Sequence, residues 1–252
     1  MVIASAVRNP GQVRRNAGHS PLCDAPGRNS RPDSAGYCEP VSPEIDLYHR
    51  FNSDLVFWFQ AKQTRENGDP VQAAIGPSLL YGSKRWLGTS GNKNIVIMSI
   101  GYRYLPSPDA PPVNRIEPIV FLNYTIPHKV LLPDRNRGDL DWAEGKFSWR
   151  YRNRLSVASK AKIRGYEVAP LVAAEAFYSS RYGKWSDTSL YAGCLFPIHK
   201  HVELNPYYEH QNATGKSPDQ KLNQLGLMLS LFFGPARHGR EKGNAALGCW
   251  IV

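Results

Sequence analysis

Large apolar and polar side chains alternate along most of the chain between residues 44 and 233. Successive side chains of a β-strand point to opposite faces of a sheet, so this period of two predicts strands with one apolar and one polar face. The apolar set of residues 220–233 comprises Leu225, Leu227, Leu229, Leu231 and Phe233. The opposite face carries Gln224, Gly226, Met228 and Ser230. No segment shows the apolar stripe of an amphipathic helix, so we expect an all-β fold.

Clusters of Gly, Pro, Asn and Asp separate the alternating segments, as in an antiparallel meander. The pattern predicts eleven strands, at about residues 44–51, 54–64, 71–82, 94–105, 113–126, 128–137, 144–160, 165–179, 186–197, 200–212 and 220–233. Most match the length of about 9–11 residues that a tilted strand needs to cross a bilayer. We therefore predict an antiparallel up-and-down transmembrane β-barrel of about 12 strands. Because bacterial barrels usually have an even number of strands, the twelfth is expected before residue 44.

Three further features favour a barrel in lipid over a soluble barrel or sandwich. The polar faces carry charges of both signs with glycines and tyrosines, as a crowded lumen would. Aromatic residues gather near segment ends, as in an interfacial girdle: Tyr102, Tyr104, Trp149, Tyr178, Trp185 and Tyr208. Tight turns at 51–54, 126–129 and 197–201 alternate with longer polar loops expected at 134–145, 179–187 and 210–219. Short turns on one rim and long loops on the other are typical of outer-membrane barrels, and they place the end of the last strand in the periplasm.

The two ends of the chain differ in composition from the alternating region. Residues 1–42 are rich in Pro, Gly, Arg, Asn and Ser and show no period, so we expect a disordered or mis-started N-terminal arm. The barrel domain is expected over residues 43–233. Residues 234–252 are expected to form a C-terminal extension.

Residues 146–159 show the alternation in its most charged form. The large apolar residues of one parity are Phe147, Trp149, Tyr151, Leu155 and Val157, and Arg150, Arg152 and Arg154 have the other. An arginine facing lipid near the bilayer midplane costs about 2–4 kcal/mol, so we expect all three in the lumen. The same argument predicts a charged lumen lined by Arg50, Arg103, Arg115, Glu117, Arg150, Arg152, Arg154, Glu167, Glu175, Glu203 and Glu209. Asp46 and Lys62 share this parity.

Such a lumen has two interpretations. Its charges form a structural network of salt bridges, or unpaired arginines make a narrow channel or a binding site for small anionic solutes. A protein of another class has the same alternation: a soluble β-barrel that binds nucleic acid or lipid through an arginine/aromatic face. This alternative requires the apolar side chains to face the interior.

Composition adds little chemistry. The formal net charge of +10 favours an anionic partner. The four cysteines, Cys23, Cys38, Cys194 and Cys249, have no metal-ligand spacing, so we predict no metal and no cofactor. A lipid hydrolase is a remote alternative, because His210 has outward parity near a long loop. Asn212 stands where that chemistry needs a serine, so we expect no enzyme activity.

Six segments resemble a known family: PEIDLYHRFN (43–52), WFQAKQTRENGDPVQAAIGPSL (58–79), SIGYRYLPSPDAPPVNRIEP (99–118), DRNRGDLDW (134–142), FSWRYRNRL (147–155) and YGKWSDTSLYAGCLFPIHKHVELNPYYEHQN (182–212). They resemble DUF2490, a bacterial family of outer-membrane β-barrel proteins without an assigned activity. The likeness covers roughly residues 43–233.

The resemblance implies a location and partners. It implies the bacterial outer membrane, contact with outer-membrane lipid and lipopolysaccharide, and insertion by the barrel-assembly machinery, with no nucleic-acid partner. Members begin with a cleavable signal and end at an aromatic that corresponds to Phe233. We therefore expect a misassigned start or an unnatural arm before the barrel, and an extension after Phe233 that impairs insertion.

Overall fold

The computed structural model describes residues 40–52, 54–66, 69–82, 96–108, 110–126, 130–214 and 220–234. Residues 1–39 of the arm expected over 1–42, and residues 235–252 of the extension expected over 234–252, lie outside these ranges. Residues 41 and 42 belong to the first strand. The described residues form strands and turns, which confirms the all-β prediction. They contain no helix that is long and apolar enough to cross a membrane.

Twelve strands follow one another along the described residues. They are β1 (Val41–Arg50), β2 (Leu55–Glu66), β3 (Asp69–Gly82), β4 (Val96–Ser107), β5 (Ala110–Ile126), β6 (Val130–Ala143), β7 (Lys146–Ser159), β8 (Ala161–Ile163), β9 (Tyr166–Ser179), β10 (Lys184–His199), β11 (Val202–Ala213) and β12 (Gln220–Phe233). Each of the eleven strands expected from the alternation is present. Among the described residues the twelfth strand of the sheet is the short β8, and the described residues just before 44 belong to β1, which begins at Val41.

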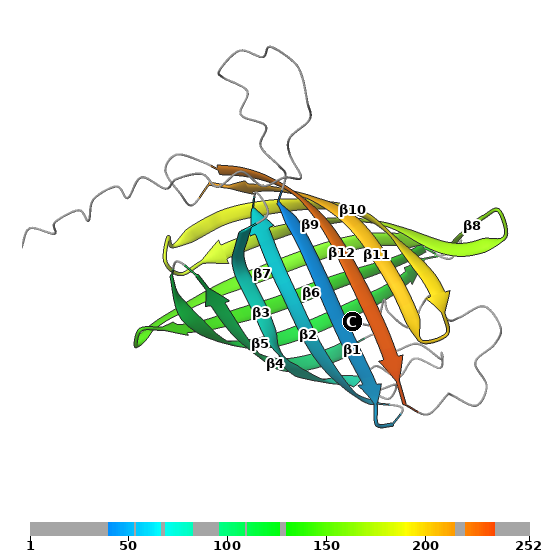
Figure 1. The fold of residues 1–252 in the computed structure, drawn as a ribbon, viewed down its shortest axis with the longest axis horizontal. Coiled ribbons are helices and arrows are strands. Elements are labelled where there is room, and N and C mark those ends of the chain that lie inside the picture. Colours follow the sequence, from blue (N-terminus) through cyan, green and yellow to red (C-terminus); the bar gives the residue numbers. More distant parts are fainter. Residues whose placement is uncertain are drawn as a thin grey trace, which may run out of the picture. The chain divides into compact units, whose positions relative to one another are not determined.

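The sheet closes into a barrel whose wall has eleven strands, because β8 pairs only with β9. Neighbouring wall strands run antiparallel, so an odd number of them leaves the first and last strands pointing the same way. β1 and β12 accordingly pair in parallel, from Val41 opposite Leu225 to His49 opposite Phe233. Figure 1 shows this seam as the blue and orange strands lying side by side.

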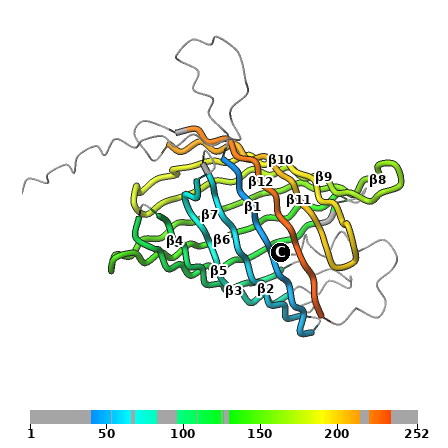
Figure 2. Tube along the Cα trace, in the orientation of Figure 1, coloured from blue at the N-terminus to red at the C-terminus, as the bar shows by residue number. Residues whose placement is uncertain are grey.

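Two hairpins are set by turns of two residues. Glu144–Gly145 joins β6 to β7, and Arg164–Gly165 joins β8 to β9. All four residues have positive φ, as the two-residue turn that matches strand twist requires. The β8–β9 hairpin continues beyond the wall, which Figure 2 shows as the yellow-green loop at its edge.

The connections do not divide into short and long rims as expected. At the rim where β1 begins, called here the start rim, residues 67–68, 108–109, 144–145, 180–183 and 214–219 connect the strands. At the opposite rim, the end rim, the longest connection spans residues 83–95. The predicted loop at 134–145 is wrong, because its first ten residues continue strand β6. The high charge of this segment and Gly138 are typical of a loop, which is why a loop was predicted here.

The two faces of the wall follow the predicted parity. On β12, Leu225 and Leu227 are 49% and 47% exposed on the outer face, whereas Gln224 and Ser230 are 6% and 1% exposed on the inner face. On β7 the exposed set contains Trp149 and the inner set contains the arginines. The barrel is therefore apolar outside, and its buried charges lie in the lumen.

Candidate functional site in the lumen

Seven arginines line one side of the lumen and form what we call the arginine wall. They are Arg103 of β4, Arg115 of β5, Arg135 and Arg137 of β6, and Arg150, Arg152 and Arg154 of β7. Strand alternation places all of them on the inner face, since each strand contributes arginines of a single parity. Four carboxylates lie among them: Glu117, Asp139, Asp141 and Glu175.

Glu175 is the counter-ion of three arginines. Its Oε1 accepts hydrogen bonds from Arg135 at 3.0 Å and from Arg152 at 2.9 Å. Its Oε2 accepts two from Arg154, at 3.0 and 2.6 Å. Tyr191 donates to the same oxygen at 3.3 Å, and its ring lies 3.8 Å from the guanidinium carbon of Arg154. The cation–π contact and the bidentate pair together hold this guanidinium in one orientation.

Asp139 has the same role nearer the start rim. Arg137 donates to its Oδ1 at 2.5 Å, and Arg150 donates to its Oδ2 at 3.0 and 3.1 Å. The guanidinium groups of Arg115 and Arg152 lie 3.4 and 3.8 Å away. Asp139 is fully buried, so its charge needs several close cations to offset its desolvation.

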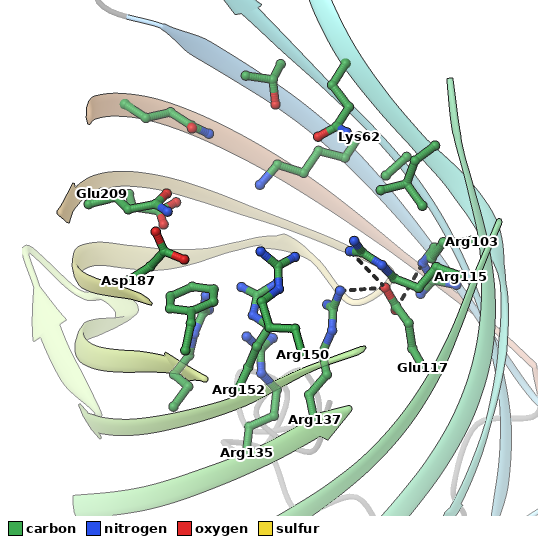
Figure 3. A pocket seen from close by; sticks show the side chains of 18 of the residues that line it. Lys62, Arg103, Arg115, Glu117, Arg135, Arg137, Arg150, Arg152, Asp187 and Glu209 are labelled. Atoms are coloured by element: carbon green, nitrogen blue, oxygen red, sulfur yellow. Dashed lines mark hydrogen bonds and ion pairs between the residues drawn. The ribbon is translucent and has the colours of Figure 1, made fainter. Parts of the chain in front are cut away.

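Glu117 links the arginines of β4 and β5 to an arginine of β6. It accepts a hydrogen bond from Arg137 at 2.5 Å and lies 3.6 and 3.9 Å from Arg103 and Arg115. Figure 3 shows Glu117 between these three guanidinium groups. Arg103 itself is anchored to the backbone, because one of its terminal nitrogens donates to the carbonyls of Gly76, Pro77 and Tyr102.

The carboxylates also relieve repulsion between arginines that stand directly opposite each other. Arg135 pairs in register with Arg154, and Arg137 pairs with Arg152. Like charges in such positions destabilise a sheet. Here Arg135 and Arg154 share the buried Glu175, and Arg137 and Arg152 share the buried Asp139, so the repulsion is offset. Seven arginines against four carboxylates nevertheless leave three positive charges in excess on this wall.

A cavity of about 690 Å³ lies against the arginine wall. Its lining extends from mid-barrel to the turn at residues 180–183 on the start rim. Arg150 is the most exposed guanidinium of the wall, with 30% of its side chain accessible. The excess charge therefore borders space that a solute can occupy.

Apolar side chains replace charged ones toward the end rim. The end-rim cluster consists of the buried residues Tyr48, Trp58, Leu80, Ile97, Ile119 and Phe121. None of these lines the cavity. The Arg103 guanidinium carbon lies 4.8 Å from the Trp58 ring and marks the boundary between the two zones. A smaller apolar cluster of Ala158, Ala169 and Leu195 occupies the same end of the opposite wall.

Eight of the eleven charged residues predicted for the lumen belong to this site. Those that line the cavity are Arg103, Arg115, Glu117, Arg150, Arg152, Arg154 and Glu209. Glu175 lies behind them, bound to the arginines. Glu203 is buried on the inner face of β11 but does not line the cavity.

Two predicted residues lie elsewhere. Arg50 ends β1 at the end rim and does not line the cavity. Glu167 forms a salt bridge of 3.8 Å with Lys162 on the β8–β9 hairpin, and 37% of its side chain is exposed. Parity assigns a side chain to the lumen only where its strand belongs to the wall, and here β9 extends past it.

The predicted lumen lining omitted four inward-facing charged residues of β6: Arg135, Arg137, Asp139 and Asp141. They alternate with Asn136, Gly138 and Leu140, so the period of two was present. The high charge of the segment caused its assignment to a loop.

The arginine/aromatic surface required by the nucleic-acid alternative is absent from β7, because its arginines and aromatics lie on opposite faces of the wall.

His210, the one catalytic candidate, has its Nδ1 2.7 Å from Oδ1 of Asn223. No group of three or more His, Cys, Asp or Glu side chains in the described ranges is arranged to hold a metal ion.

The fold and the lumen define a class: a closed β-barrel with an apolar exterior and an arginine-rich interior. Residues 45–222 match the family DUF2490, described as a protein of unknown function. The chain therefore belongs to this family, as its six characteristic segments indicated. A comparison with curated proteins finds no match.

Proposed function

We propose that this protein is an integral β-barrel of the bacterial outer membrane whose lumen takes up small anionic solutes. The membrane part of the proposal is supported by the outer face. Large apolar side chains that face outward with more than two fifths of their surface exposed include Ile45, Leu79, Ile100, Leu155, Val172, Leu190 and Leu225. Such a continuous apolar exterior is costly in water and favourable in acyl chains.

Aromatic residues near the rims support the same proposal. At the start rim, the tilted rings of Trp142 and Phe147 have centroids 5.1 Å apart, and Trp149 stacks with Tyr178 at 5.6 Å. Phe51 and Phe233 are exposed at the end rim. Aromatic side chains at two levels are typical of the interfaces of a membrane barrel. The partners are then outer-membrane lipid and lipopolysaccharide, and the barrel-assembly machinery during insertion.

Heat-modifiable migration tests the location. The full chain, extracted in non-ionic detergent, should run at different positions in SDS electrophoresis before and after boiling. Recovery in soluble form without detergent, with one mobility in both samples, would refute the membrane proposal.

The anion part rests on one observation: the excess of three positive charges beside the cavity. A guanidinium with free donors binds carboxylate, sulfonate or phosphate groups well. Because the end-rim cluster lies beyond the cavity, the lumen serves better as a binding site entered from the start rim than as an open pore.

Calorimetric titration with ethanesulfonate tests the anion part. Arg150→Gln should weaken binding by about tenfold, because one charge-assisted hydrogen bond contributes about 1.5 kcal/mol or more. Lys162→Gln is the matched control, since it removes an equal charge from the hairpin outside the lumen. An equal effect of both variants, or no binding by the natural protein, would contradict the proposal.

A further inference from the structure

The side of the cavity away from the arginines carries the opposite charge. Glu44 of β1, Asp187 of β10 and Glu209 of β11 line it and form what we call the acidic wall. Lys62 of β2 is its single ammonium group among the described lining residues. Figure 3 shows Glu209 and Asp187 together on one side of the cavity and the guanidinium groups on the other.

Strand order explains this separation. Strands β4 to β7 carry the arginines, and β10, β11 and β1 carry the acids. In the closed ring, β9 stands between these groups on one side and β2 and β3 on the other. The cavity therefore has a cationic and an anionic wall facing each other.

Glu209 is the group on the acidic wall without a direct contact to a donor among the described residues. Its residue is only 7% exposed, yet its carboxylate takes part in no hydrogen bond or salt bridge among the described residues. Lys62 attracts Glu209 electrostatically but does not contact it directly, because the Lys62 ammonium lies 3.7 Å from Glu44 and donates to Tyr207 at 3.2 Å. A buried carboxylate facing a cavity without a donor is an acceptor site for a ligand.

We propose that the cavity binds small zwitterions, with the anionic group on the arginine wall and an ammonium group on Glu209 and Asp187. This deepens the proposed function and rests on it. An ammonium group has three donors and no acceptor, which suits a wall of carboxylates. A solute with both charges satisfies both walls at once, whereas a simple anion leaves Glu209 desolvated and unpaired.

The occupant is a free solute and not a lipid headgroup. The cavity is lined mainly by polar side chains, and the apolar end-rim cluster consists of side chains already buried against one another. Acyl chains attached to the ligand find no apolar space in this part of the barrel.

A matched series of ligands tests the proposal on the full chain in non-ionic detergent, because a zwitterionic detergent would compete. The probes are ethanesulfonate, ethylammonium, and ω-aminoalkanesulfonates of two to five carbons. At the best charge spacing the zwitterion should bind at least about tenfold more tightly than ethanesulfonate, equal to about 1.4 kcal/mol. Addition of lipid vesicles with zwitterionic headgroups should leave this binding unchanged.

Glu209→Gln isolates the acidic wall. It should abolish the preference for the zwitterion and leave ethanesulfonate affinity equal or higher. Glu167→Gln, an equal change outside the lumen, should preserve the preference. Heat-modifiable migration of each variant verifies the fold, and Glu209→Asp provides a conservative variant that keeps the charge.

The outcomes separate the two proposals. If ethanesulfonate binds and no zwitterion binds more tightly, the zwitterion inference fails alone. If the preference survives Glu209→Gln, the acidic wall is not its source and the inference fails. If no sulfonate binds, the proposed function fails with it.

Discussion

Arg154 and Glu175 stand directly opposite each other on β7 and β9, and two nitrogens of Arg154 donate to the same carboxylate oxygen at 3.0 and 2.6 Å. The other oxygen of Glu175 binds Arg135 and Arg152. One acid thus neutralises part of the charge of three arginines on two strands.

Replacing this acid should destabilise the barrel. Glu175→Gln leaves buried guanidinium groups without their shared counter-ion, so we expect the free energy of unfolding to fall by about 3–5 kcal/mol. Urea unfolding of the protein in micelles, followed by tryptophan fluorescence, measures this loss. Glu167→Gln removes only an exposed pair and should cost about 0–1 kcal/mol. Similar losses for both variants would show that Glu175 is not a structural centre.

Gly226 of β12 makes room for the ring of Tyr207. A Cβ at this position would lie 2.0 Å from Cζ of the ring, so Gly226→Ala must displace Tyr207 from its contact with Lys62. We expect a loss of about 1–3 kcal/mol in the same unfolding measurement. Adding Tyr207→Ala should suppress the effect of Gly226→Ala, and full additivity of the two changes would contradict this packing.

Neighbouring positions on β12 test which face meets lipid. Leu227 is exposed on the outer face and Met228 lines the cavity. Leu227→Arg should cost about 2–4 kcal/mol in a bilayer and reduce insertion into vesicles. Met228→Arg can reach the water of the lumen and should insert more efficiently. Folding into vesicles, read as heat-modifiable protein, compares the two variants, and the reverse order would invert the proposed orientation.

A disulfide across the seam tests closure by parallel pairing. Ile45 and Leu229 are register partners, and adjacent strands lie about 4.8 Å apart, within the range that a disulfide bridges. In a chain whose native cysteines are replaced by serine, Ile45→Cys with Leu229→Cys should crosslink under mild oxidation. Ile45→Cys with Leu227→Cys is displaced by two residues and should crosslink poorly. Equal yields would argue against this register.

The sequence predicted the wall because a strand's alternation is a local property. The exposed leucines of β12 and the inward arginines of β7 follow from a period of two alone. The same reasoning failed at Arg135 and Asp139. Their side chains alternate, but the glycine and the high charge of the segment led to the prediction of a loop. Glu167 was misplaced because parity does not tell where a strand leaves the wall.

Only the tertiary structure decided how the charges meet. Which arginines share Glu175 depends on the registers of β6, β7 and β9, and the opposition of Glu209 to the arginine wall depends on the order of eleven strands around a closed ring. The parallel seam follows from that odd number. The face on which a side chain lies is set by the alternation along its own strand. The residues that it contacts across the barrel depend on how distant strands pair, and no single segment encodes that pairing.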